Sequence, residues 1–70
     1  MRVTKKNLRV LNGANVVDSY ILANKKDYEN EPKESVIIDL MVNILHYAHS
    51  LGLNTEAINR MAVGHFVTEK

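Results

Sequence analysis

The segment 34–51 constrains this chain most, because its pattern is that of a long α-helix with two apolar faces. Polar residues recur in it three or four positions apart and form one polar row: Ser35, Asp39, Asn43, His46 and Ser50. A broad apolar face contains Val36, Ile37, Leu40, Met41, Ile44, Tyr47, Ala48 and Leu51. A second, narrow apolar stripe consists of Ile38, Val42, Leu45 and His49. A surface helix normally has one apolar face, so we expect other helices to cover one side and a partner to cover the other.

Length and composition limit the class of protein. A chain of 70 residues is expected to form a single domain, 1–70, and to bury only roughly 60% of its unfolded surface. We therefore expect part of the apolar 46% to be buried between chains, in a homodimer or against another protein. The absence of cysteine excludes disulfides and thiol chemistry. No signal-type segment and no apolar run of ~20 residues is present, which predicts a soluble cytoplasmic protein with no membrane partner.

Charge is distributed unevenly, although the net charge of +1 is too small to indicate nucleic acid. Arg2, Lys5, Lys6 and Arg9 all precede the first acidic residue, Asp18, so that 1–11 is a small basic arm. Such an arm can contact phosphate or an acidic protein surface, or simply remain solvated. Its pattern is compatible with a strand, an extra helical turn or disorder.

Local signals predict two further helices. The first is expected over about 13–26, with Asn12 as its N-cap. After a polar linker, Pro32 suits the first turn of the long helix. That helix should end at Gly52, and Asn54 or Thr55 should cap the third helix. We expect the end of the chain, 68–70, to fray. The predicted buried stripe of the third helix consists of Ile58, Met61, Ala62, His65 and Phe66.

The predicted fold class is therefore all-α: a compact three-helix domain with a long central helix and a C-terminal pair that resembles a helix-turn-helix. The offsets of that motif are met by Ala48, Gly52, Leu53, Ile58 and Met61. The segment 52–60 also resembles the turn and recognition helix of Cro-type phage repressors. This resemblance implies DNA contacts by Asn54, Thr55, Glu56, Asn59 and Arg60, with phosphate contacts by Arg2, Lys5 and Lys6. Any helical hairpin with a glycine cap produces much of the same pattern.

Little in the sequence indicates catalysis or a cofactor. His46, His49 and His65 are the only soft metal ligands, and the first two belong to different faces of the helix. Asp39 and His46 share the polar row but lie about two turns, ~10 Å, apart. No nucleophile has a base placed beside it, and no glycine-rich phosphate loop is present. We expect no enzyme, metal, cofactor or small-molecule substrate.

The C-terminal half resembles a group of small uncharacterised proteins of phages and plasmids. The resemblance rests on Asp39-Leu40, His46-Tyr47-Ala48, Gly52, Ala57, Ala62 and His65-Phe66. The chain departs from that pattern at Asn43, where the group tends to a second aspartate, and at Asn54-Thr55, where it tends to an acidic stretch. The resemblance implies a mobile-element origin and transfers no activity to any residue.

These observations lead to two functional hypotheses. The first is a small non-enzymatic accessory protein that binds a host or defence factor, or itself, through Ile38, Val42, Leu45 and His49, because an exposed apolar stripe requires a cover. The alternative is a dimeric helix-turn-helix regulator that reads DNA through 54–60. A structural subunit of a larger particle would use the same stripe.

Overall fold

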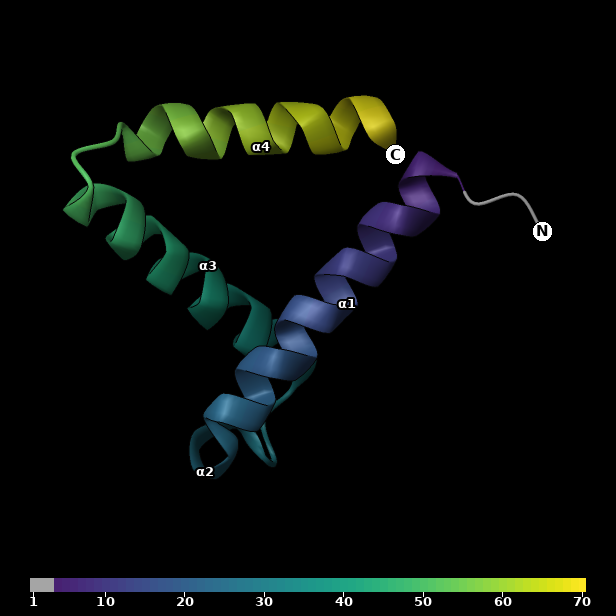
Figure 1. The fold of residues 1–70 in the computed structure, drawn as a ribbon, viewed down its shortest axis with the longest axis vertical. Helices are drawn as coiled ribbons and strands as arrows, with labels where there is room; N and C mark the ends of the chain where they lie inside the picture. The colour runs from purple at the N-terminus through teal and green to yellow at the C-terminus, as the bar shows by residue number, and fades with distance from the viewer. Residues whose placement is uncertain (1–3) are drawn as a thin grey trace.

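Four helices account for the chain in the computed structural model, which describes residues 4–70. They are α1 (Lys5–Ala23), α2 (Lys25–Tyr28), α3 (Lys33–Ser50) and α4 (Thr55–Glu69) (Figure 1). Of the described residues 84% are helical and none forms a strand, which confirms the all-α class. The additional element relative to the three expected helices is α2, a single turn that follows α1 directly.

The three long helices lie as the sides of an open triangle rather than side by side (Figure 1). The start of α3 packs against α1, α4 continues from the end of α3, and the end of α4 returns to the start of α1. The molecule measures 37 × 36 × 17 Å and has a radius of gyration of 13.9 Å. A compact chain of this length would have a radius of gyration of roughly 11 Å. The expected compact arrangement is therefore not what this chain adopts.

The first helix begins earlier than predicted. Its N-cap is Thr4, whose Oγ1 accepts a hydrogen bond from the Asn7 N–H at 3.1 Å, and the helix continues without a break through Asn12 and Gly13. The prediction of an N-cap at Asn12 was wrong, because a single glycine inside a helix costs only about 1 kcal/mol and an upstream cap was present. The part of the basic arm that the structure describes is therefore helical. Its Arg2 lies outside the described residues.

The turn between α3 and α4 matches the prediction. Gly52 has φ +76°, its N–H donates to the His49 carbonyl at 2.9 Å, and the Leu53 N–H donates to the Ala48 carbonyl at 3.1 Å. This is the Schellman arrangement that a glycine at C′ makes possible. Asn54 is the N-cap of α4, with its Oδ1 accepting from the Ala57 N–H at 3.0 Å. At the start of α3, Pro32 is the N-cap residue rather than part of the first turn.

The apolar core is very small. Among the described residues only Val36 and Ala48 are buried, and Val36 is fully excluded from solvent at the α1–α3 corner. The predicted buried stripe of α4 was wrong: Met61 and Phe66 are exposed, Phe66 to 63%, because α4 leaves the end of α3 instead of packing along it. For the same reason most of the broad apolar face of α3 remains accessible to solvent.

Candidate interaction surface

A chain of polar side chains holds α3 against α1 and α2. The Asn43 amide donates to the Tyr20 hydroxyl at 2.7 Å, and the Tyr20 and Tyr28 hydroxyl oxygens lie 2.8 Å apart. The Tyr28 hydroxyl donates to Asp39 Oδ2 at 3.1 Å, which leaves the Tyr20 hydroxyl as the donor to Tyr28. The two rings are tilted by 38° with centroids 5.1 Å apart. Two members of the polar row, Asp39 and Asn43, thus have a structural role.

This polar chain also changes the acidity of Tyr28. The hydrogen bond with Tyr20 is the largest influence, followed by burial and by the bond to the Asp39 carboxylate, and together they raise the pKa of Tyr28 well above its ordinary value. The bond to Asp39 opposes the phenolate, because a deprotonated oxygen could no longer donate to that carboxylate, and burial opposes the charged form as well. The bridge between α2 and α3 therefore depends on the neutral phenol.

The narrow apolar stripe faces solvent along α3. Ile38 is 53% exposed and Val42 45% exposed, Leu45 is half-buried and His49 is exposed. Val42, Leu45 and His49 line one shallow depression together with His46 and Thr55. The structure therefore places three of the four predicted contact residues in one continuous surface, at the corner where α3 meets α4.

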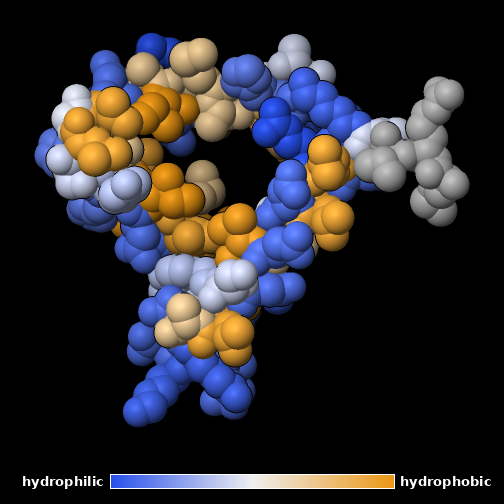
Figure 2. All heavy atoms as spheres, viewed as in Figure 1, coloured by the Kyte–Doolittle hydropathy of each residue, from blue (hydrophilic) through white to orange (hydrophobic). Residues whose placement is uncertain are grey.

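A second apolar depression lies in the same corner. It is lined by Met41, Ile44, Leu45, Ile58, Asn59 and Ala62, which come from the broad face of α3 and from α4. Figure 2 shows apolar side chains gathered along α3 and α4 around an opening framed by the long helices. Because Leu45 borders both depressions, the narrow stripe and the broad face meet there. Met41, Ile44, Ile58 and Ala62 were expected inside the domain, and only the position of α4 exposes the depression that they line.

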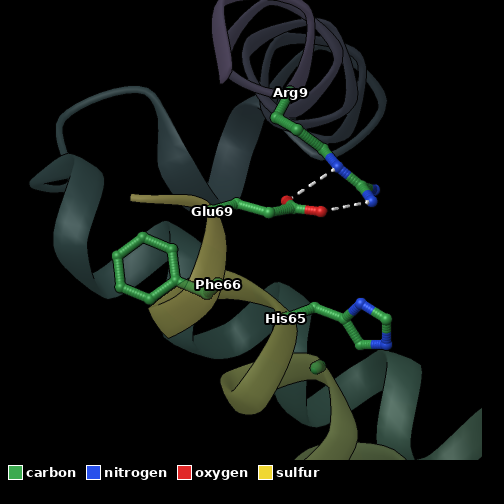
Figure 3. A pocket seen from close by; sticks show the side chains of 5 residues that line it. Arg9, His65, Phe66 and Glu69 are labelled. Atoms are coloured by element: carbon green, nitrogen blue, oxygen red, sulfur yellow. Dashed lines mark hydrogen bonds and ion pairs between the residues drawn. The ribbon is translucent and has the colours of Figure 1, made fainter. Parts of the chain in front are cut away.

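The corner between α4 and α1 is closed by one carboxylate. Glu69 lies 3.2 Å from Lys5 Nζ, and its two oxygens each lie 3.2 Å from a nitrogen of the Arg9 guanidinium (Figure 3). The hydrogen bond from Lys5 is the largest influence on the pKa of Glu69 and lowers it; burial opposes this effect, and the bond and charge of Arg9 lower the pKa further. Fraying was expected at this end of the chain, whereas the ion pairs keep Glu69 within α4. No local signal indicates a pairing between residues so far apart in the sequence.

The residues predicted to bind DNA do not converge on one face. Lys5 is paired with Glu69 at the end of α4, and Lys6 lies beside it on α1, whereas Asn54 caps the opposite end of α4. A helix of 15 residues is about 22 Å long, which separates these cations from the start of the helix. The oxygen of Asn54 is already engaged by Ala57.

The remaining members of this set occupy different parts of α4. Thr55 borders the depression at the narrow stripe, and Asn59 lines the one beneath the broad face. Glu56 and Arg60 are exposed to solvent. A DNA site at 54–60 would therefore have Arg60 as its only cation within those residues.

The histidines are also separated. His46 and His49 border the depression at the narrow stripe, whereas His65 lines the pocket at the α1–α4 corner with Arg9 and Phe66 (Figure 3). Within residues 4–70 no group of three or more His, Cys, Asp or Glu side chains is arranged to hold a metal ion. None of the described helices is long and apolar enough to cross a membrane.

The chain matches no protein-family model, no curated protein and no solved structure.

Proposed function

We propose that this chain is a small non-enzymatic accessory protein that acts by binding another protein through the narrow apolar stripe of α3. The proposal includes the mobile-element origin that the sequence resemblance implies, and with it a host or defence factor as one class of partner. The observation that carries it is the near absence of a core: of the side chains that the structure describes, only Val36 and Ala48 are buried.

Exposed apolar side chains on this scale support a binding role. Isolated exposed apolar residues are normal on a protein surface, but continuous apolar patches typically mark interaction sites. Here Ile38, Val42 and Leu45 follow one another along α3 and continue into the depression bordered by Thr55. Residues spaced in this way along one helix are the usual contacts of a helix that packs into the groove or against the helix of a partner.

The polar chain, on the side of α3 next to the narrow stripe, supports the same interpretation. Asp39 and Asn43 are tied to Tyr28 and Tyr20, so that side of α3 faces its own chain. The narrow stripe is consequently held in a defined orientation before any partner arrives. A binding residue that is already oriented loses less conformational entropy on association, which favours affinity.

Site-specific photo-crosslinking in host cells tests the proposal. A benzoylphenylalanine at position 42 should give a discrete ultraviolet-dependent adduct, because Val42 lies within the stripe. The matched control carries the same group at position 22, where Leu22 is 75% exposed on α1 and outside the stripe. A strong adduct at 42 with none at 22 is expected. Equal labelling at both positions, or none at 42, would show that the stripe is not a binding surface.

A DNA-binding regulator is the second candidate, favoured by the glycine turn at Gly52 and the cap at Asn54. Amide-resolved NMR titration with duplex DNA at low salt distinguishes it. Shifts confined to 54–60 and the start of α1, which disappear as salt is added, would support it. Arg60→Ala should then weaken binding by about 1–3 kcal/mol if Arg60 contacts a base. If the amide resonances of α4 do not shift when DNA is added, the DNA-binding candidate fails and protein binding is left as the proposed function.

A further inference from the structure

The molecule is flat and encloses almost no core. Its shortest dimension is 17 Å, against 37 Å and 36 Å for the other two, and of the described side chains only Val36 and Ala48 are buried. Stable domains are usually built from at least two packed layers that enclose a core between them. This chain supplies one layer, with apolar side chains on α3 left without a covering layer.

The exposed area indicates how large the missing layer is. The chain exposes 6149 Å², whereas a folded monomer of its mass, 7.9 kDa, would expose roughly 4,400 Å². The excess is roughly 1,700 Å² per chain. Obligate homodimers typically bury about 2,000–5,000 Å² in total, so two chains that each covered this excess would fall within that range. Even half of the excess would match the roughly 800 Å² that each partner contributes to a stable interface.

The residue spacing of the narrow stripe suits packing against α3 of a second copy of this chain. Ile38, Val42, Leu45 and His49 are spaced four, three and four residues apart, which is the spacing of a two-helix seam rather than of a wide core-facing surface. Val42 and Leu45 alternate as a β-branched residue and a leucine do in two-stranded seams. With a net charge of +1 per chain, two copies repel each other only weakly.

We propose that the partner seated on the narrow stripe is a second copy of this chain, which packs its own α3 stripe against the first and supplies the missing layer. This inference rests on the proposed function, because it names the occupant of the same surface. In the dimer Val42 and Leu45 of each chain pack between the two copies of α3. The polar chain of Tyr20, Tyr28, Asp39 and Asn43 stays within each chain.

Sedimentation of the purified full chain between about 1 μM and 1 mM tests the assembly. The wild type should sediment at twice the chain mass of 7.9 kDa. Val42→Glu should raise the dissociation constant by about 100-fold, since it places a charge at the centre of the seam. Leu22→Glu, an equally drastic change on an exposed part of α1, should leave the mass at that of the dimer. A monomeric wild type, or a dimer insensitive to Val42→Glu, would overturn the inference.

Because Val42→Glu could unfold the chain, a conservative variant provides an independent measurement. The chain contains no cysteine, so Val42→Cys and Leu22→Cys each introduce a single reactive thiol. A short bismaleimide should convert Val42→Cys to a covalent dimer within minutes while Leu22→Cys remains monomeric. Equal crosslinking of the two variants would contradict the seam.

The two proposals fail in different ways. A monomeric wild type whose position 42 nevertheless captures a larger protein in cells would overturn the second-copy inference and leave protein binding standing. A monomer that also gives no adduct at 42 would overturn both.

Discussion

Two corners of the triangle are built in contrasting ways. At the α1–α3 corner Val36 is fully buried, and four polar side chains connect the helices through hydrogen bonds, of which the one between Tyr20 and Tyr28 is partly buried. At the α1–α4 corner the connection is made by Glu69 with two cations, Lys5 and Arg9, whose side chains are largely exposed. Exposed ion pairs contribute little to stability, whereas a buried methyl-bearing side chain contributes substantially.

The α1–α3 corner is therefore the more firmly held frame of the molecule, and α4 at the α1–α4 corner is the more weakly held, mobile end. The α1–α3 corner should persist in any assembly, because breaking it exposes apolar surface and unpairs hydrogen bonds. The α4 end can separate from α1 at little cost, which would let α4 adjust when a partner covers its apolar residues. Regions with few buried contacts are generally those that open first.

The largest expected effect is at the buried side chain of the frame. Val36→Ala removes two methyl groups from the fully buried site and should lower the free energy of unfolding by about 2 kcal/mol. Urea unfolding at a fixed protein concentration measures it. Val67→Ala, at an exposed position of α4, serves as control and should cost less than about 0.5 kcal/mol. Equal losses at the two sites would remove the distinction between frame and mobile end.

A smaller loss is expected when the polar chain is interrupted. Tyr20→Phe deletes the hydroxyl that accepts from Asn43 and bonds to Tyr28, and it should cost about 1 kcal/mol. Tyr47→Phe makes the same chemical change on an exposed part of α3 and should leave the unfolding midpoint unchanged. If both variants unfold alike, the hydrogen bonds at this corner do not stabilise it.

Alkaline pH should weaken the frame through the same residues. The folded-state pKa of Tyr28 is raised above its ordinary value of 10.0, so the folded chain retains a proton that the unfolded chain has lost. Stability is therefore fully present below about pH 10 and falls as pH rises toward the folded-state pKa. Thermal unfolding at about pH 9 and about pH 11 should show this decline in the wild type. Tyr28→Phe should show a shallower decline, and an identical one would exclude Tyr28 as its source.

The smallest effect on stability is expected at the α1–α4 corner. There the measured quantity is the distance between the start of α1 and the end of α4. Glu69→Gln removes the charge that attracts Lys5 and Arg9, so the distance between spin labels placed at 6 and 70 should increase and broaden. Glu56→Gln, at the opposite end of α4, should leave that distance unchanged.

Acid should have the same effect as Glu69→Gln. The pKa of Glu69 is lowered in the folded chain, so its pairing is fully present above the ordinary value of 4.5 and is lost as pH falls through the folded-state pKa. A corner that stays closed in acid would show that other contacts hold α4 in place.

Parts of this structure could be predicted because they depend on residues within a few positions of one another. The end of α3 at Gly52 and the cap of α4 at Asn54 follow from the conformational freedom of glycine and from a side-chain oxygen that reaches a backbone N–H three residues on. The residues of the narrow stripe could be predicted for the same reason, since a helix places residues three and four positions apart on one side. The start of α1 was predicted wrongly, because both Thr4 and Asn12 are residue types that cap helices and only the structure shows that Thr4, the weaker type, is used.

The amino-acid sequence predicts the three long helices apart from the start of α1, the turn between α3 and α4, and the two apolar faces of α3, because hydrogen bonds and side-chain periodicity within a helix are local. Three features become visible only when the helices are placed in space: α4 closes a triangle instead of covering α3, Glu69 pairs with Lys5 and Arg9, and Asp39 and Asn43 bind tyrosines of α2 and α1. These contacts join residues 11 to more than 60 positions apart, and their formation depends on how whole helices are placed. That placement leaves most of the broad apolar face of α3 exposed in addition to the narrow stripe, and the exposure of the broad face cannot be inferred from a periodic pattern alone.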